Sequence, residues 1–165
     1  MFTHTRELTI EWGQCDPAGI VFNPRFFEIF DASTAFLFAA ALGMNKRAMM
    51  KAYNMAGFPL VKTQAEFHVP AAFGDKIRVE STVSALRRTS FDVQHRIFKG
   101  DALAVEGFET RVWVRRNPDD PERIKSQPIP DEVVARLKAG HSNNAASGVT
   151  RPTSAVPSLS GHKRT

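Results

Sequence analysis

Few residues in the chain could cross-link it, anchor it in a membrane or bind a metal. Cys15 is the only cysteine, so no internal disulfide can form, and this usage fits a reducing cytoplasm. No apolar run approaches the roughly 18 residues that span a bilayer, and the N-terminal segment has no basic stretch followed by an apolar one. We therefore expect neither a membrane span nor a signal peptide. The five histidines show no metal-site spacing, so we expect no metal.

Negative charge is missing from the end of the chain. The last 26 residues contain no acid but hold Arg151, Lys163 and Arg164, so residues 1–139 carry only +2 of the formal charge of +5. A nucleic-acid surface requires a clustered basic face with interleaved aromatic residues, and this distribution does not supply one. We expect no nucleic-acid partner, whereas a small anionic ligand remains compatible with the charge.

Enough apolar residues are present for one core. The chain has 165 residues, 42% of them hydrophobic, with thirteen phenylalanines against one tyrosine, so apolar rings should fill the interior. Residues 140–165 are instead rich in Ser, Asn, Ala, Gly and Pro. We predict one domain over 1–139 and a disordered C-terminal tail over 140–165.

Apolar periodicity predicts the order of the elements. Period-two alternation indicates strands, and an unbroken apolar stretch that starts at a proline indicates a buried helix. The predicted strands are 7–12, 60–69, 76–86, 91–98 and 103–114, the predicted helices are 24–42, 45–55 and 130–139, and 117–121 is predicted as a loop. One helix segregated against an antiparallel sheet of about five strands is an α+β arrangement.

Residues 12–31, WGQCDPAGIVFNPRFFEIFD, are the most informative stretch. Asp16-Pro17-Ala18-Gly19 predicts a tight turn, which is followed by Asn23 as a helix cap and Pro24 as the first helical residue. The Asp16 carboxylate should therefore lie close to a helix N-terminus, whose free N–H groups carry partial positive charge. A carboxylate facing such donors across a space for an acyl group suits acyl transfer.

Each of these motifs also has a purely structural interpretation. Asp16 could simply start a turn, and Arg87-Arg88 could be the solvated end of a hairpin. Phe26, Phe27 and Phe30 are interpreted as core, as is His95, a structural histidine with satisfied ring nitrogens.

The motif Cys15-Asp16-Pro17-Ala18-Gly19-Ile20-Val21, followed by Asn23-Pro24 and the stretch 27–31, resembles the 4-hydroxybenzoyl-CoA thioesterases of the hot-dog fold. The resemblance covers roughly residues 5–117. It implies an antiparallel sheet wrapped around one long buried helix. It also implies dimers, usually tetramers, of identical subunits with active sites at the subunit interface.

The resemblance assigns roles to particular residues. Asp16 matches the catalytic carboxylate, as nucleophile or general base, and the Asn23 backbone N–H would polarise the thioester carbonyl. Asp31 and the segment Phe58-Pro59-Leu60 match substrate-binding positions, and Arg87-Arg88-Thr89 match the loop that contacts the CoA phosphates. Guanidinium groups suit this role because they bind phosphate bidentately. CoA is part of the substrate, and no other cofactor is implied.

The leading hypothesis is hydrolysis of an aromatic acyl-CoA such as 4-hydroxybenzoyl-CoA. A short-chain aliphatic acyl-CoA or acyl-carrier-protein thioesterase would use the same Asp16. A non-catalytic CoA-ester-binding protein is a third possibility, although a binder gains little from a charge beside the thioester. A dehydratase of the same fold is less favoured, because the sequence shows no matching Asp/His pair.

Overall fold

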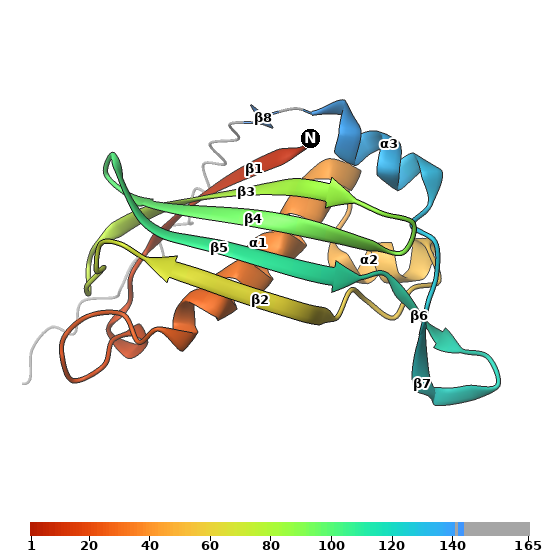
Figure 1. Cartoon of the computed structure of the whole chain (residues 1–165), viewed down its shortest axis with the longest axis horizontal. Helices are drawn as coiled ribbons and strands as arrows, with labels where there is room; N and C mark the ends of the chain where they lie inside the picture. Colours follow the sequence, from red (N-terminus) through yellow and green to blue (C-terminus); the bar gives the residue numbers. More distant parts are fainter. Residues whose placement is uncertain (141, 144–165) are drawn as a thin grey trace, which may run out of the picture.

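A computed structural model describes residues 1–140 and 142–143 of the chain. A six-stranded sheet forms one layer, and helix α1 lies along one of its faces (Figure 1). In chain order the elements are β1 (Thr3–Thr9), the 3-10 turn η1 (Trp12–Gln14), α1 (Pro24–Leu42), α2 (Lys46–Ala52), β2 (Leu60–Phe67), β3 (Lys76–Leu86), β4 (Ser90–Lys99), β5 (Ala102–Val112), β6 (Val114–Asn117), β7 (Asp120–Ser126), α3 (Asp131–Ala139) and β8 (Ser142–Asn143).

The sheet has the strand order β2-β5-β4-β3-β1-β8. Strands β3, β4 and β5 form successive antiparallel hairpins, β1 pairs with β3, and β2 pairs with β5 at the other edge. The predicted α+β arrangement with five antiparallel strands is confirmed. Strand β8 adds a short parallel pairing, in which Ser142 and Asn143 lie opposite Thr3 and His4. The rest of the predicted disordered tail lies outside the described residues.

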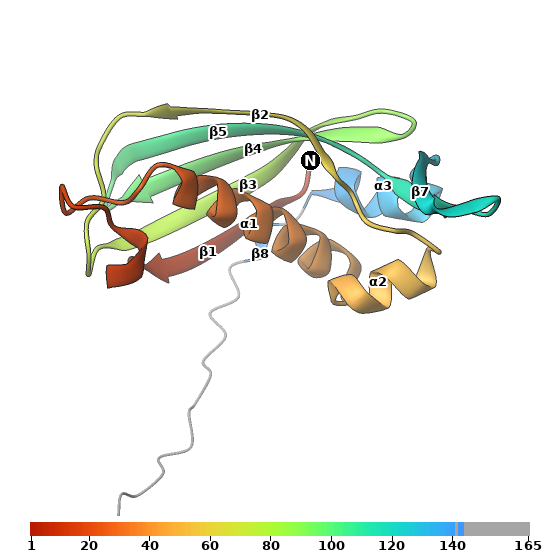
Figure 2. The ribbon, with the colours of Figure 1, turned by 90° about the horizontal axis from the view of Figure 1, so that it is seen from below.

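Helix α1 has the predicted bounds, but it is not buried on all sides. It has 19 residues and lies against one face of the sheet, so the sheet does not enclose it (Figure 2). Phe30, Leu37 and Phe38 face the sheet and are fully buried, whereas Phe36 is 51% exposed. Helix α1 therefore buries one face against the sheet and leaves Phe36 exposed, although its apolar sequence predicted burial all round.

The two ends of α1 are formed differently from each other. Gly43 ends the helix as predicted, with φ of 67° and its N–H donating to the Ala39 carbonyl. Asn23 occupies the cap position, yet its side chain caps nothing, and its φ and ψ of −46° and −42° are already helical. The predicted Asn23 side-chain cap is therefore wrong, since a capping residue needs an extended backbone to reach back.

Two apolar clusters fill the space between the layers. One contains Phe38, Phe91 and Trp113, and the other surrounds Phe30 near the start of α1. Phe26 and Phe30 are buried and Phe27 packs at the edge, which confirms their interpretation as core.

The predicted loop at 117–121 contains the turn of a hairpin whose strands were not predicted. Strands β6 and β7 form this exposed two-stranded hairpin, which projects from one end of the sheet (Figure 1). The strand signal in the sequence is weak here, because the hairpin has few apolar residues to alternate with its charged ones.

Among the described residues no single helix is long and apolar enough to span a membrane. Helices α1 and α2 reach the required length and composition only when taken together, as a pair bent by 61°.

Replacing Gly107 with alanine should destabilise the fold, because its Cβ would lie 2.5 Å from Cε2 of the buried Phe30 ring. That ring is stacked on His95 and is fully buried, so it cannot move aside into solvent. Overpacking of this kind costs about 1–3 kcal/mol of unfolding free energy, measurable by urea denaturation.

Gly13→Ala is the matched control, since a Cβ at that position would meet nothing within 4 Å. Equal losses of unfolding free energy in the two variants would show that the close packing of Gly107 against Phe30 does not contribute to stability.

Candidate functional site

The Asp16 turn has the predicted form. The Gly19 N–H donates to the Asp16 carbonyl at 2.9 Å, and Gly19 has a φ of 79°, a conformation that favours glycine. Asp16 Oδ1 accepts from the Ala18 N–H at 2.8 Å, so this oxygen does form an Asx turn. Oδ2 has no protein partner in the described part of the chain and the side chain is half-buried. The Asx turn therefore uses only Oδ1, and Oδ2 of Asp16 is free to react with a substrate or water.

Backbone pairing brings this turn back to the start of α1. The Asp16 N–H donates to the Ile20 carbonyl at 2.9 Å, and the Phe22 N–H donates to the Gln14 carbonyl at 2.9 Å. The Val21 N–H is held by the Ala71 carbonyl at 2.8 Å. Residues 14–22 thus form a closed loop, and Asn23 is the next residue along the chain.

The Asn23 N–H is available to a ligand. The carbonyls of Phe22 and Asn23 accept from the N–H groups of Arg25 and Phe26, but the Asn23 N–H itself has no acceptor within residues 1–140 and 142–143. Asn23 also lines a pocket of about 140 Å³ whose walls include Ile20, Phe26 and Phe67. A free N–H beside a small apolar hollow is the kind of group that can polarise a carbonyl, and this role of Asn23 stays a prediction.

The four predicted substrate-binding residues share a second pocket. Asp31, Phe58, Pro59 and Leu60 line a space of about 320 Å³ with Arg111, and we call this space the Asp31 pocket. Its remaining walls include Lys46 and Ile124.

Phe58 contributes to the pocket through its backbone. The residue is only 3% exposed, and its ring stacks on Phe38 at 5.0 Å between ring centroids and belongs to the core. Its carbonyl accepts from Arg111 Nη1 at 3.3 Å. An aromatic ring at this position therefore does not by itself fill the pocket.

The predicted phosphate-binding turn joins β3 to β4. Arg87 forms a bidentate pair with Asp92, with N–O distances of 2.9 and 2.6 Å, and this pair lowers the pKa of the Asp92 carboxyl. Arg88 is exposed and its guanidinium has no acid partner among the described residues. The carbonyls of Arg88 and Thr89 accept from the N–H groups of Ile129 and Trp113 at 2.8 Å each.

One chain does not bring these groups together. The Asp16 loop lies at one end of the sheet, and the β3–β4 turn and the start of β2 lie at the other (Figure 1). Asp31 is eight residues beyond Asn23, or about 12 Å along the helix axis. The structure thus brings Asp31 to residues 58–60 and ends the Asp16 loop beside Asn23, and it leaves Arg87, Arg88 and Thr89 apart from both.

The sequence interpretation missed a buried polar cluster between sheet and helix. His95, Glu109 and Arg111 lie on the inner face of the sheet and are at most 3% exposed. Glu109 Oε2 accepts from Thr34 Oγ1 at 2.9 Å and lies 3.3 Å from His95 Nε2, while Ser81 Oγ is 2.8 Å from His95 Nδ1. The sequence did indicate that these two side chains point inward. Every second residue of a strand lies on the same face, and Glu109 and Arg111 share a face with the buried Val105 in β5.

These contacts determine the charges in the cluster. Burial lowers the pKa of His95, so the ring is neutral, with Nε2–H directed at Glu109 and Nδ1 accepting from Ser81. Burial opposes the ionisation of Glu109, but hydrogen bonds from His95 and Arg111 and the charge of Arg111 outweigh it and lower the Glu109 pKa to about 2. The structural role predicted for His95 is confirmed.

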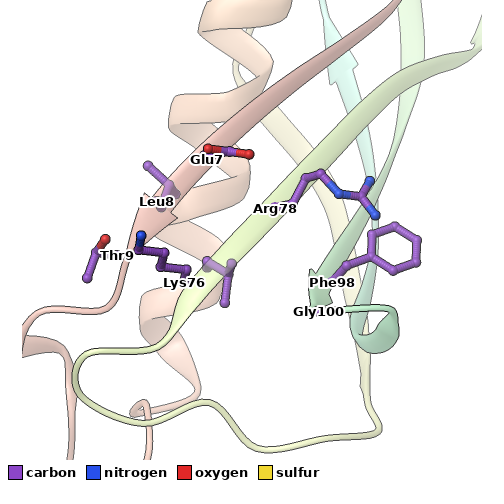
Figure 3. Close-up of a pocket in the computed structure, with 8 residues that line it drawn as sticks. Glu7, Leu8, Thr9, Lys76, Arg78, Phe98 and Gly100 are labelled. Atoms are coloured by element: carbon purple, nitrogen blue, oxygen red, sulfur yellow. The ribbon is translucent and has the colours of Figure 1, made fainter. Parts of the chain in front are cut away.

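A further pocket, of about 490 Å³, lies on the outer face of the sheet between β1, β3 and the end of β4 (Figure 3). Arg78 lies over the Phe98 ring at 4.4 Å and is paired with Glu80. The pocket contains none of the predicted site residues.

Among the described residues, no group of three or more His, Cys, Asp or Glu side chains could hold a metal ion.

Comparison with protein families matches residues 10–137 to the Thioesterase-like superfamily. The match covers most of the chain, which therefore belongs to this superfamily. The predicted assignment to an acyl-CoA thioesterase family is confirmed.

Individual relatives agree with this assignment. The 4-hydroxybenzoyl-CoA thioesterase of Pseudomonas sp. strain CBS-3 is 29% identical over 135 residues, covering 79% of this chain and 94% of the relative. Its solved structure matches with a TM-score of 0.75 at 26% identity, over 82% of this chain and 99% of that one.

A 1,4-dihydroxy-2-naphthoyl-CoA hydrolase of Microcystis aeruginosa is 24% identical over 127 residues, 77% of this chain and 87% of the relative. The structure of a 1,4-dihydroxy-2-naphthoyl-CoA thioesterase from Synechocystis shares the fold, with a TM-score of 0.69 at 21% identity over 82% of this chain and 96% of that one. The predicted hot-dog fold is confirmed.

The buried cluster should make stability depend on pH. Glu109 has a pKa of about 2 in the folded protein against 4.5 normally, so its stabilisation is present above pH 4.5 and is lost as the pH falls toward 2. His95, with its pKa lowered, acts in the same direction below pH 6.5. We expect Glu109→Gln to be less stable than wild type at about pH 7 and to lose less stability between about pH 5.5 and 3.5, measured by urea unfolding.

The exposed Glu122 provides the control, since Glu122→Gln should follow the wild-type pH curve. A Glu109→Gln curve parallel to wild type over this range would contradict the account of the cluster.

Proposed function

We propose that the protein hydrolyses an aromatic acyl-CoA to the free acid and CoA. The observation that carries this proposal is the backbone pairing of Gln14 with Phe22 and of Asp16 with Ile20, which closes a loop that contains a half-free Asp16 carboxylate and ends beside the unpaired N–H of Asn23. The chemistry needs a carboxylate, a backbone donor and water, so no metal and no cofactor beyond the CoA of the substrate enters the proposal. Cys15, the only cysteine, fits a cytoplasmic protein.

Asp16 can act in two ways. As a nucleophile, Oδ2 attacks the thioester carbonyl, CoA leaves as the thiolate, and water then hydrolyses the mixed anhydride. As a general base, Asp16 removes a proton from water, which attacks the same carbon while CoA leaves. In both routes the Asn23 N–H stabilises negative charge on the carbonyl oxygen.

Two arguments favour an aromatic acyl group. The curated relatives are named for 4-hydroxybenzoyl-CoA and 1,4-dihydroxy-2-naphthoyl-CoA, both of which are aryl thioesters. The Asp31 pocket, at about 320 Å³, is in the range of small-molecule sites and combines apolar walls with the polar groups of Asp31 and Arg111.

The site proposed here is completed by a second copy of the chain. Asp16 and the β3–β4 turn lie at opposite ends of one chain, so they can serve one substrate only if subunits combine. Strand β2 leaves one edge of the sheet unpaired among the described strands, and Val61, Phe67 and Phe36 are exposed apolar residues on β2 and α1. We propose a homodimer or tetramer in which Asp16 of one copy faces the Asp31 pocket of another.

The first test measures release of free CoA thiol from 4-hydroxybenzoyl, benzoyl, phenylacetyl, acetyl and hexanoyl thioesters. We expect the aryl esters to have the highest kcat/KM, and Asp16→Asn to lower kcat about 10²- to 10⁴-fold. Asp101→Asn, which removes a carboxylate from an exposed turn, is the matched control and should keep wild-type kcat.

Each outcome of this test has a separate meaning. A preference for acetyl or hexanoyl esters would replace the aromatic assignment with an aliphatic one. Binding of the esters without any turnover would favour a CoA-ester-binding protein. An Asp16→Asn variant as active as wild type would exclude Asp16 from the catalysis.

Arg88 should contribute more to CoA binding than Arg87. The Arg87 guanidinium is already paired with Asp92, whereas Arg88 has no acid partner in the described chain and is free to bind a phosphate. We expect Arg88→Ala to raise the inhibition constant of free CoA about tenfold with little change in kcat. Arg87→Ala should have the smaller effect, and the reverse order would refute the argument from pairing.

A further inference from the structure

Arg111 connects the buried cluster to the Asp31 pocket. Its Nε and Nη2 donate to the two oxygens of Glu109 at 2.9 Å each. Its Nη1 forms an ion pair with Asp31 Oδ1 at 2.8 Å and donates to the Phe58 carbonyl at 3.3 Å. The guanidinium thus contacts β5, α1 and the segment before β2. Two of these three groups form walls of the Asp31 pocket.

The guanidinium is fixed from behind. Its partner Glu109 is held by Thr34 and His95, and Ser81 holds the far side of the His95 ring. With the Arg111 side chain only 4% exposed, its planar fork has one geometry that satisfies these acceptors. Burial alone would lower the pKa of Arg111, but the hydrogen bonds and charge of Glu109 raise it, so the group stays cationic.

Asp31 has the opposite environment. Its side chain is 58% exposed, and an exposed ion pair ordinarily contributes little because both side chains move. Here the Arg111 guanidinium is fixed, so it holds Oδ1 of Asp31 in place, while Oδ2 has no partner in the part of the chain described. Nη1 of Arg111 also holds the Phe58 carbonyl, so the two walls of the pocket formed by Asp31 and Phe58 are connected.

We propose that Arg111 is the positioning residue of the acyl-binding pocket. It fixes the Asp31 carboxylate and the Phe58 carbonyl relative to each other, and so determines selection for an aromatic acyl group over a small one. This inference rests on the proposed function and adds to it a residue that acts through others, since Arg111 takes no part in the bond-breaking step.

The test compares kcat/KM for benzoyl-CoA and acetyl-CoA in wild type, Arg111→Lys, Asp31→Asn and the double variant. Lysine keeps the charge but cannot bridge Glu109, Asp31 and Phe58 at once. Each single variant should lower the aryl-over-acetyl ratio about tenfold through the KM for benzoyl-CoA, with the acetyl-CoA rate nearly unchanged. The double variant should be no worse than either single one, because both changes break the same connection.

Two controls separate positioning from general damage. Glu28→Gln removes an exposed α1 carboxylate that pairs with the surface residue Arg25, and it should leave the ratio unchanged. Inhibition by free CoA should be unchanged in all variants if the β3–β4 turn is intact. If Arg111→Lys fails to fold, Asp31→Asn still decides, since an unchanged ratio in that variant overturns the inference.

The failures can be told apart. A wild-type protein that hydrolyses none of the thioesters overturns the proposed function, and the inference with it. An active wild type with additive effects of Arg111→Lys and Asp31→Asn, or with an unchanged ratio in either, overturns the inference alone.

Discussion

The fold depends on a carboxylate that is kept charged between the sheet and the helix. Glu109 would be costly to bury alone, and it is stable there because Thr34, His95 and Arg111 all donate to it. These donors come from α1, β4 and β5, so satisfying one charge fixes the register of three elements. Nearby, the absence of a side chain at Gly107 admits the Phe30 ring, which stacks on His95 at 4.8 Å. Polar and apolar packing therefore specify the same arrangement.

Local and long-range constraints divide the site into parts. Hydrogen bonds close residues 14–22 into one short loop that contains Asp16 and ends beside Asn23, so this part of the site is encoded locally in the sequence. Asp31 and Phe58 are instead connected through Arg111, which lies in a third element and contacts both. The β3–β4 turn is more distant still, and only association of chains would bring it to Asp16.

Local patterns predicted the fold well and its buried polar contacts poorly. The bounds of α1 and of β3 follow from Pro24, Gly43 and clean alternation, because each signal is a property of neighbouring residues. The cap at Asn23 failed because its backbone is already helical, which no residue preference reveals. The Arg87 pairing with Asp92 and the inward direction of the Phe58 ring depend on cross-strand or long-range partners. The charge cluster was missed for the same reason, since its members come from four elements.

The backbone of the β3–β4 turn is held from two sides, by Ile129 on the Arg88 carbonyl and by Trp113 on the Thr89 carbonyl. A ligand that reaches Arg88 therefore does not have to order a loose loop. The conformational entropy lost on binding is confined to one long side chain, about 2 kcal/mol or less. Association at this turn should proceed without a slow loop rearrangement, so that its rate is set by diffusion and by the charge of the ligand.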